Sequence, residues 1–361
     1  MKRNEGLVEA YLERLANEAS ERYQQFPVQL ETIYFGGGTP SHLSDKELTQ
    51  VTETLSKTWG FPAKLETTLE ADPLTFNKER LQLFKELGFN RLSIGLQSTQ
   101  DNVLKFLGRV HTGAEGLEAV SMGLEAGFEV SADLITGIEH QDTAKDLHSL
   151  AQTSVPHISV YSLTIEPFTP FALRKVQRNE DKEANDYDLT NEILTRYGLE
   201  RYEVSSHAKV GHESKHNQVY WSGDYFLALG PSASGFVESQ GFGFRVSGIE
   251  KTQHPTPNIL HPFRYTNPPI KFWLNNQAPE VTAITPERYV QDVLMTGLRT
   301  KRGVDVERLE ERTNINLLTR YKEIIRLFTE HELLELKENH LVATDKGLLQ
   351  LNGMVSRFLE G

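Results

Sequence analysis

The chain has 361 residues, of which 38% are hydrophobic and 24% charged, with 26 glycines and 15 prolines. This length predicts two domains, or one barrel-sized domain with an appendage, and the composition is that of a globular protein rather than a disordered or collagen-like chain. The 38 Lys and Arg residues against 50 Asp and Glu residues leave a formal charge of -12, which predicts no nucleic-acid partner because phosphate binding needs a cationic surface.

The N-terminal half alternates helix-period stretches with short β-branched apolar runs. Predicted helices span residues 7–19, 78–87, 113–126 and 144–153, and predicted strands span residues 32–35, 65–69, 91–96, 129–135 and 158–164. The alternation predicts a parallel sheet, and a repeat of about 30 to 35 residues favours a closed or nearly closed (β/α) barrel over a doubly wound sheet. No Gly-x-Gly-x-x-Gly opens a helix, so the dinucleotide-binding signature is missing.

Local signals mark the connections between these elements. Ser44 and Glu47 fit a capping box at the start of a helix. After Tyr202 the sequence becomes aromatic and rich in glycine, with turns predicted at Gly223, Gly230 and Gly235. Residues 253–279 are rich in Pro and Asn and show little periodicity, which indicates a linker.

The last 75 residues predict helix, helix, hairpin and helix, an order that resembles a winged helix. The hairpin strands are predicted at residues 333–336 and 340–344, on either side of Asn339. Between Glu287 and Gly361 there are 13 acidic and 12 basic residues, so this segment lacks the basic excess expected of a DNA-binding domain.

Polar residues and glycines end successive predicted strands. They are Gly36 to Gly38, Glu70 with Asp72, Gln97 with Ser98, and Asp133, with Arg109 in the region after the third strand. In a parallel barrel these strand ends converge on one mouth. Glycines expose backbone groups without a Cβ, Glu70 and Asp133 can accept hydrogen bonds from an ammonium group or ribose hydroxyls, and Arg109 can bind a carboxylate. The set suits a zwitterionic nucleoside.

Each of these residues alone also suits a structural role. The glycine run fits a plain connection from strand to helix, and Glu70 or Asp133 fits a helix cap or turn, because side-chain oxygens near helix starts satisfy free backbone N–H groups. Gln97 alone carries almost no information. The occurrence of the whole set at matching strand ends is what favours a functional site.

Several motifs together resemble radical S-adenosylmethionine proteins of the oxygen-independent coproporphyrinogen oxidase group. They are Tyr-Phe-Gly-Gly-Gly-Thr-Pro-Ser (34–41), Glu-Ala-Asp-Pro (70–73), Arg-Leu-Ser-Ile-Gly-Leu-Gln-Ser (91–98), Leu-Gly-Arg-Val-His (107–111) and Ala-Asp-Leu-Ile-Thr-Gly (132–137). Residues 202–208, the His-Asn-Gln-Val-Tyr-Trp motif at 216–221 and Leu-Gly-Pro-Ser-Ala at 229–233 are similar to the HemW haem-chaperone branch. The resemblance covers nearly the whole chain, including the C-terminal domain.

The resemblance implies an α/β fold: a partial (β/α) TIM-like barrel of the radical SAM type, with a C-terminal winged-helix-like α+β domain. Residues 1–240 would form the barrel core, residues 241–285 a linker and aromatic segment, and residues 286–361 a domain similar to the HemN C-terminal domain. It also implies contacts to S-adenosylmethionine from Gly37, Gly38, Thr39, Glu70, Gln97, Arg109 and Asp133.

His216 is implied to lie in the region that handles haem. Imidazole is a common ligand of haem iron, and Tyr220 and Trp221 offer flat apolar area to a porphyrin. A hydrogen-bonded structural histidine beside an aromatic cluster is the alternative interpretation. His111, His207 and His212 are less favoured candidates for the same role.

The sequence departs from this family in one respect. Family members carry a Cys-x-x-x-Cys-x-x-Cys loop for a [4Fe–4S] cluster after the first strand, whereas this sequence contains no cysteine. We therefore expect it to begin just after that loop, without the first strand, and to be redox-inactive and not catalytic as given. A start site placed too far downstream, a shortened polypeptide and a gene that has lost its cluster are the alternatives, of which truncation is favoured.

The function expected from the resemblance is that of a haem-binding chaperone of the HemW type, which transfers haem to acceptor proteins and in its complete form uses S-adenosylmethionine and a [4Fe–4S] cluster. An oxygen-independent coproporphyrinogen III oxidase-like radical enzyme and a non-catalytic binding module without a cluster are the alternatives. No secretory signal and no spanning helix are predicted, which indicates a cytoplasmic protein and leaves peripheral membrane contact open. The acceptor proteins and the oligomeric state are not predicted.

Overall fold

The computed structural model describes residues 5–61, 65–238 and 262–360. The chain divides into two compact units. The barrel unit comprises Leu30–Thr52 and Phe61–Ser214, and the composite unit comprises Met1–Gln29, Glu53–Gly60 and Lys215–Gly361. Among the described ranges, no helix has the length and apolar character needed to cross a bilayer.

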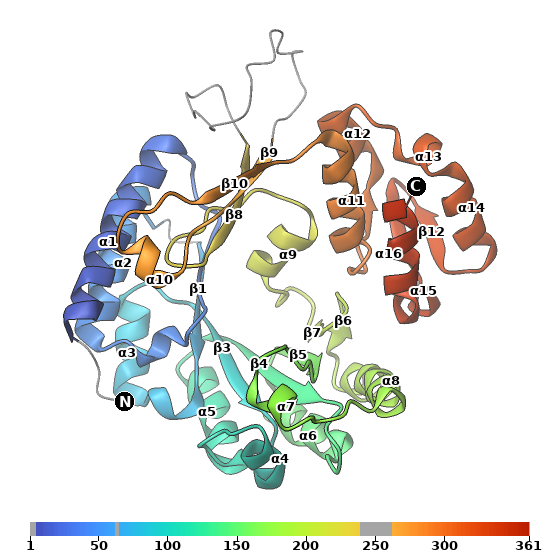
Figure 1. The fold of residues 1–361 in the computed structure, drawn as a ribbon. Helices are drawn as coiled ribbons and strands as arrows, with labels where there is room; N and C mark the ends of the chain where they lie inside the picture. Colours follow the sequence, from blue (N-terminus) through green and yellow to red (C-terminus); the bar gives the residue numbers. More distant parts are fainter. Residues whose placement is uncertain (1–4, 62–64, 239–261, 361) are drawn as a thin grey trace. The chain divides into compact units, whose positions relative to one another are not determined.

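A seven-stranded sheet forms the centre of the barrel unit, in the order β1-β2-β3-β4-β5-β7-β6 (Figure 1). Its strands are β1 (Thr32–Phe35), β2 (Glu66–Ala71), β3 (Arg91–Gln97), β4 (Glu129–Thr136), β5 (His157–Ser162), β6 (Glu200–Arg201) and β7 (Ser206–Ala208). The strands β1 to β5 are parallel, whereas β7 is antiparallel to both β5 and β6. The sheet is therefore open, with β1 and β6 as the edges that the described residues form.

Helices connect the parallel strands, as the alternating sequence pattern predicts. They are η1 (Pro40–His42), α2 (Asp45–Trp59), η2 (Pro73–Thr75), α3 (Lys78–Glu86), α4 (Asp101–Phe106), α5 (Gly113–Glu125), α6 (Thr143–Ala151), α7 (Pro170–Leu173) and α8 (Glu180–Arg196). The capping box predicted before α2 is confirmed, since the Ser44 N–H donates to Glu47 Oε2 at 2.8 Å and the Glu47 N–H donates to Ser44 Oγ at 3.4 Å. The partial parallel barrel is confirmed.

Four neighbouring strands each carry a fully buried apolar residue directly followed by a polar one. These pairs are Leu69 and Glu70, Leu92 and Ser93, Ala132 and Asp133, and Ile158 and Ser159. Successive side chains of a strand point to opposite faces of the sheet, so the apolar members share one face and the polar members share the other. The polar face therefore carries a row of oxygen-bearing side chains that runs across β2, β3, β4 and β5.

The composite unit contains a long helix and a small antiparallel sheet. The helix is α1 (Glu5–Gln25), and the sheet has the order β10-β9-β8, with β8 (Ser234–Glu238), β9 (Pro262–Thr266) and β10 (Glu280–Ala283). Two short helices, α9 (Lys215–Trp221) and α10 (Ile270–Trp273), belong to the same unit. Val237, Phe263 and Tyr265 form its buried apolar cluster, with Phe26 packed against them.

Two expectations for this region are corrected. Gly235 lies inside β8 rather than at a turn, and an added Cβ would stand 2.3 Å from the Tyr265 ring, so glycine is required here by close packing across the strands. Of the segment expected to be a linker, residues 262–279 contain β9 and α10, and residues 241–261 lie outside the described residues. Because Pro and Asn are rare in strands, the sequence of this segment did not predict β9. The boundaries at residues 240 and 285 stay a prediction.

The C-terminal part has helices, a hairpin and then helices, as predicted, but with more elements than the expected order of helix, helix, hairpin and helix. Its elements are α11 (Pro286–Gly297), β11 (Val304–Asp305), α12 (Val306–Thr313), α13 (Leu317–Arg320), α14 (Lys322–Glu330), β12 (Leu334–Lys337), β13 (His340–Ala343), α15 (Asp345–Leu349) and α16 (Leu351–Glu360). The predicted hairpin is confirmed as β12 and β13, and β11 adds to β13 to complete a three-stranded antiparallel sheet.

A buried carboxylate ties α1 to the segments around the small sheet. Glu18 is only 1% exposed, and its Oε2 accepts hydrogen bonds from the Gly230 N–H at 2.9 Å and the Trp273 indole at 3.1 Å. Its Oε1 accepts from the Asn267 amide at 2.7 Å and lies 3.6 Å from the Arg22 guanidinium. Because a buried charge is tolerated only with full pairing, these four partners make Glu18 a structural anchor of the unit.

We expect Glu18→Ala to lower the free energy of unfolding by about 3–5 kcal/mol, because it leaves the buried Arg22 charge without its carboxylate. Urea unfolding followed by tryptophan fluorescence measures this, and Trp273 lies within the affected network. Glu21→Ala is the matched control on the same helix, since it removes a more exposed pair with Arg14 worth at most about 1 kcal/mol. Equal losses for the two variants would contradict the anchoring role.

Candidate functional site

Glu70, near the end of β2, holds the glycine loop that follows β1. The Tyr34 hydroxyl donates to Glu70 Oε1 at 2.8 Å, and the Gly37 N–H donates to Glu70 Oε2 at 3.0 Å. Burial, together with the negative charge of Glu70, raises the pKa of Tyr34, which keeps this hydroxyl protonated as a donor. A carboxylate has about four lone-pair positions, so Glu70 keeps acceptor capacity for a ligand after these two bonds.

The glycine loop presents bare backbone at the end of β1. An added Cβ at Gly36 would lie 2.6 Å from the Tyr34 ring and 2.9 Å from Glu70 Oε1, so only glycine fits there. Gly37 has a φ of +105°, and a Cβ on Gly38 would meet no atom within 4 Å. Thr39 also has a positive φ, of 59°. The loop therefore has open space beside Gly37 and Gly38, where a ligand can approach the backbone directly.

Gln97 and Arg109 lie close to a carboxylate at the end of β2. Arg109 Nη1 is 3.6 Å from Asp72 Oδ1, and the side chain of Arg109 is 36% exposed. A Cβ added to Gly95 would lie 2.9 Å from Gln97 Nε2 and 3.4 Å from Asp72 Oδ1. Both side chains therefore lie beside this glycine, and a larger residue there would displace them. Asp72, which belongs to the predicted strand-end set, thus lies close to two of the predicted site residues.

Asp133 belongs to the polar row on the sheet. The Ser93 hydroxyl donates to Asp133 Oδ2 at 3.1 Å, Ser93 lies opposite Glu70 in the strand register, and Asp133 lies opposite Ser159. Burial raises the pKa of Asp133 to about 6, with a smaller contribution from the Glu70 charge, while hydrogen bonds from Ser93 and Ser159 oppose the shift. Asp133 can therefore change its protonation near neutral pH.

Contacts and strand register connect the seven residues predicted to contact S-adenosylmethionine. Glu70 contacts the loop that contains Gly37 to Thr39, Ser93 links the Glu70 and Asp133 positions, and Asp72 lies close to Gln97 and Arg109. Six of them lie at, near or after the carboxyl ends of parallel strands, but the expected strand-end position of Asp133 is corrected, because Asp133 lies three residues before the end of β4. Tyr34, Ser93 and Ser159 are additional members that the sequence did not single out for binding, and Asp72 belonged to the predicted strand-end set without being assigned a ligand contact.

These residues suit the parts of S-adenosylmethionine. Open glycine backbone and carboxylates can bind an ammonium group and ribose hydroxyls, and a partly exposed guanidinium can bind the carboxylate. The residues present do not suit a [4Fe–4S] cluster. The sequence has no cysteine, and residues 5–61, 65–238 and 262–360 contain no group of three His, Asp or Glu side chains placed to hold a metal ion.

His216 lies on α9 in the composite unit, beside aromatic rings. Its Nε2 and the Tyr220 hydroxyl share a hydrogen bond of 2.8 Å, and the two rings meet edge to face with centroids 5.0 Å apart. The Tyr220 ring in turn meets Phe226 at 4.6 Å. Burial lowers the pKa of His216 to about 4, so the imidazole is neutral at pH 7 and able to offer a nitrogen lone pair to a metal.

The end of α9 is fixed by contacts to α11 and α12. The Tyr289 hydroxyl donates to the Gly223 carbonyl at 2.9 Å, and Asp224 pairs with Arg308 and with Arg312, the latter at 3.1 Å. Burial would raise the pKa of Asp224, but the hydrogen bond from Arg308 and both arginine charges lower it, so this carboxylate stays ionised. The winged-helix part thereby supports the segment that follows His216.

The less favoured histidines all lie in the barrel unit. His111 Nε2 contacts the Leu96 carbonyl at 3.0 Å, and His212 Nδ1 contacts Glu129 at 2.6 Å. His207 is buried in β7, and burial lowers its pKa to about 3. The contacts of His111 and His212 suit structural histidines. Neither ring nitrogen of His207 has a hydrogen-bond partner among the described residues, but this side chain is only 2% exposed and so presents no open face to a haem. None of the three gains support as a haem ligand.

The comparison with known proteins agrees with this architecture. Residues 3–151 match the Radical SAM superfamily, and residues 284–349 match the HemN C-terminal domain. The heme chaperone HemW of Lactococcus lactis is 29% identical over 98% of this chain and 90% of the relative, and that of Bacillus subtilis is 30% identical over 91% and 86%. The solved coproporphyrinogen III oxidase (HemN) of Escherichia coli, described as a radical SAM enzyme, superimposes with a TM-score of 0.78 at 20% identity, covering 99% of this chain and 84% of that one.

The raised pKa of Asp133 predicts a pH-dependent stability. The folded protein holds this proton more tightly than the unfolded chain, so the free energy of unfolding should fall as pH rises from about 4 to about 6, by about 1–3 kcal/mol from this residue. Asp133→Asn should remove that part of the slope in urea unfolding measured across the window. Asp188→Asn, on the exposed face of α8, should keep the wild-type slope, and a wild-type slope in Asp133→Asn would contradict the shift.

Proposed function

The chain belongs to the HemW family of radical S-adenosylmethionine proteins, as its motifs predicted, and we propose that it binds haem and passes it to acceptor proteins. The observation that carries this proposal is the placement of His216. It is a neutral imidazole beside Tyr220 on a short helix whose following residues are fixed by α11 and α12. Relatives that are similar over most of the chain are named heme chaperones.

Haem would be held at His216 by its iron and by its flat face. A neutral imidazole binds haem iron without first losing a proton, which favours binding at pH 7. The edge-to-face contact of Tyr220 with Phe226 supplies apolar area for the porphyrin. Haem is here the cargo of the protein, and release to an acceptor would require breaking the bond from a single histidine.

S-adenosylmethionine is the second ligand that we propose. Gly37, Gly38 and Thr39 would bind it through backbone groups, and Glu70, Gln97, Arg109 and Asp133 through side chains. In radical SAM proteins this cofactor is a source of radicals once it receives an electron from a [4Fe–4S] cluster. The residues present offer no ligands to such a cluster, so the function proposed for this sequence is binding rather than radical chemistry.

The alternative of a coproporphyrinogen oxidase rests on the likeness to HemN, which at 20% identity concerns the fold alone. No contact among the described residues favours it over haem binding. Assignment of residues 286–361 as a separate domain, localisation in the cytoplasm and the lack of a nucleic-acid partner stay predictions from the sequence.

Haemin titration tests the role of His216. The wild type should give a saturable shift of the Soret band, and His216→Ala should bind about tenfold more weakly, equivalent to about 1.4 kcal/mol, because the iron loses its ligand. His331→Ala removes an exposed histidine of the same unit and should bind as the wild type does. Equal affinity of His216→Ala and the wild type would overturn the assignment.

Calorimetric titration with S-adenosylmethionine tests the strand-end site. Glu70→Gln keeps the size of the side chain but removes its charge, and we expect binding to weaken about tenfold. Glu139→Gln is the matched control, since Glu139 is an exposed acidic residue soon after β4. A site elsewhere would be indicated if Glu70→Gln bound the ligand as tightly as the control.

A further inference from the structure

Gln97 has a backbone conformation that its sequence does not favour. Its φ is +67°, in the left-handed region that residues with a Cβ rarely adopt. The Ser98 N–H donates to the Leu96 carbonyl at 2.8 Å, so Gln97 is the central residue of a tight three-residue turn. The pairing of β3 with β4 also shifts register between Ile94 and Gln97. Such strain persists only where surrounding contacts hold it.

A buried carboxylate holds the residues that follow this turn. Asp146 has no exposed surface, and its Oδ1 accepts hydrogen bonds from the Thr99 N–H at 2.8 Å and from the Thr99 hydroxyl at 2.6 Å. Its Oδ2 accepts from the Ser98 hydroxyl at 2.8 Å and from the Gln141 amide at 2.9 Å. Ser98 is also fully buried. Two oxygens of one side chain thus bind the two residues directly after Gln97.

Asp146 is not needed to begin its own helix. Asp142 is the N-cap of α6, and its side chain accepts a hydrogen bond from the Lys145 N–H at 3.0 Å. Burial of an ionised carboxylate is costly unless every oxygen is paired. Because the contacts of the Asp146 side chain go to the loop after β3 and to Gln141, its burial serves the strand end rather than the helix.

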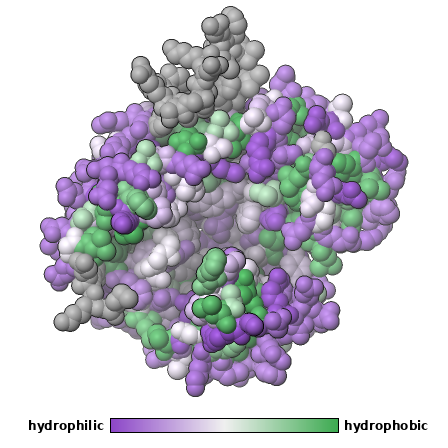
Figure 2. Space-filling model, in the orientation of Figure 1, coloured by the Kyte–Doolittle hydropathy of each residue, from purple (hydrophilic) through white to green (hydrophobic). Residues whose placement is uncertain are grey.

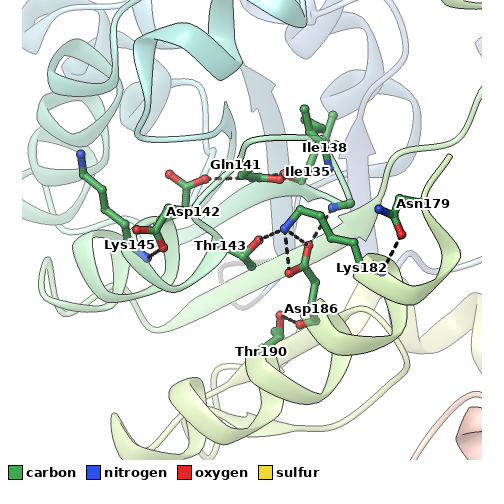
Figure 3. A network of polar contacts seen from close by, with 12 residues as sticks. Ile135, Ile138, Gln141, Asp142, Thr143, Lys145, Asn179, Lys182, Asp186 and Thr190 are labelled. Atoms are coloured by element: carbon green, nitrogen blue, oxygen red, sulfur yellow. Dashed lines mark hydrogen bonds and ion pairs between the residues drawn. The ribbon is translucent and has the colours of Figure 1, made fainter. Parts of the chain in front are cut away.

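A second carboxylate acts in a similar way on the next strand. Asp186 of α8 accepts a hydrogen bond from the Gly137 N–H at 3.0 Å and pairs with Lys182, which lies 3.4 Å from the Thr143 hydroxyl. Figure 3 shows Lys182 between Thr143 and Asp186, with Gln141 turned toward the backbone of Ile135. Buried acidic residues of α6 and α8 therefore fix the loops after both β3 and β4.

We propose that Asp146 is a positioning residue for the S-adenosylmethionine site, which holds Ser98 and Thr99 so that Gln97 keeps its positive φ. This inference rests on the binding of S-adenosylmethionine proposed above. The side chain of Gln97 lies beside Gly95 and Asp72, close to Arg109, and a relaxed backbone at Gln97 would turn its amide away from these groups. Asp146 acts on the ligand only through Gln97.

A double-mutant cycle on S-adenosylmethionine binding tests this dependence. Asp146→Asn should weaken binding about tenfold in the wild-type background, but less than about twofold when Gln97→Ala is already present. Asp142→Asn, at the N-cap of the same helix, should bind like the wild type. A tenfold loss from Asp146→Asn in both backgrounds would show a general structural effect and overturn the proposal. If Asp146→Asn does not fold, Ser98→Ala replaces it in the same cycle.

Hydrogen exchange separates the failure of this inference from that of the proposed function. The Thr99 N–H should be protected in the wild type and should exchange at least tenfold faster in Asp146→Asn, without any ligand present. Unchanged exchange at Thr99 would overturn the positioning role even if S-adenosylmethionine binds. Faster exchange in a protein that does not bind S-adenosylmethionine would instead overturn the proposed site and the role of Gln97 in it.

Discussion

The candidate site depends on the register of the parallel strands. Because side chains alternate between the two faces of a strand, one polar residue after each buried apolar residue is enough to build a polar row across the sheet. Glu70 lies opposite Ser93, and Asp133 lies opposite Ser159. A shift of one residue in any of these strands would turn the polar side chain toward the helices and an apolar one toward the site, so the burial of residues such as Leu69 also fixes the position of Glu70.

Buried carboxylates fix the loops in both units. The buried carboxylates Asp146, Asp186 and Glu18 accept hydrogen bonds from the backbone N–H groups of Thr99, Gly137 and Gly230, and the partly exposed Glu70 accepts one from Gly37 in the same way. Loop backbone close to a ligand has no strand neighbour to satisfy its N–H groups, and an ionised acceptor forms stronger hydrogen bonds than a neutral one. The strongly acidic composition therefore reflects internal use of carboxylates as well as surface charge.

The sequence predicted the strands of the barrel to within two residues, because β-branched runs between glycine and proline turns are a local signal. It also predicted polar residues near the ends of β2 and β3, at Glu70 and Gln97, whereas Asp133 lies inside β4 rather than at its end. It could not predict the positive φ of Gln97 or the contact of Asp146 with Ser98, since these depend on residues 47 or 48 positions apart in the chain. The strands β6 and β7 were missed because two or three residues are too few to show a period.

Charged residues of the winged-helix part stabilise the segment that follows α9 in the same composite unit. Arg308 and Arg312 pair with Asp224, and Arg312 also donates to the Tyr289 hydroxyl at 2.7 Å, while Tyr289 holds the Gly223 carbonyl. An arginine that is paired with a carboxylate inside the fold offers little net charge to an outside polyanion. Arg308 and Arg312 here stabilise the segment after α9. The same fold can thus act as a support for His216, because the function of a fold depends on the side chains placed on it.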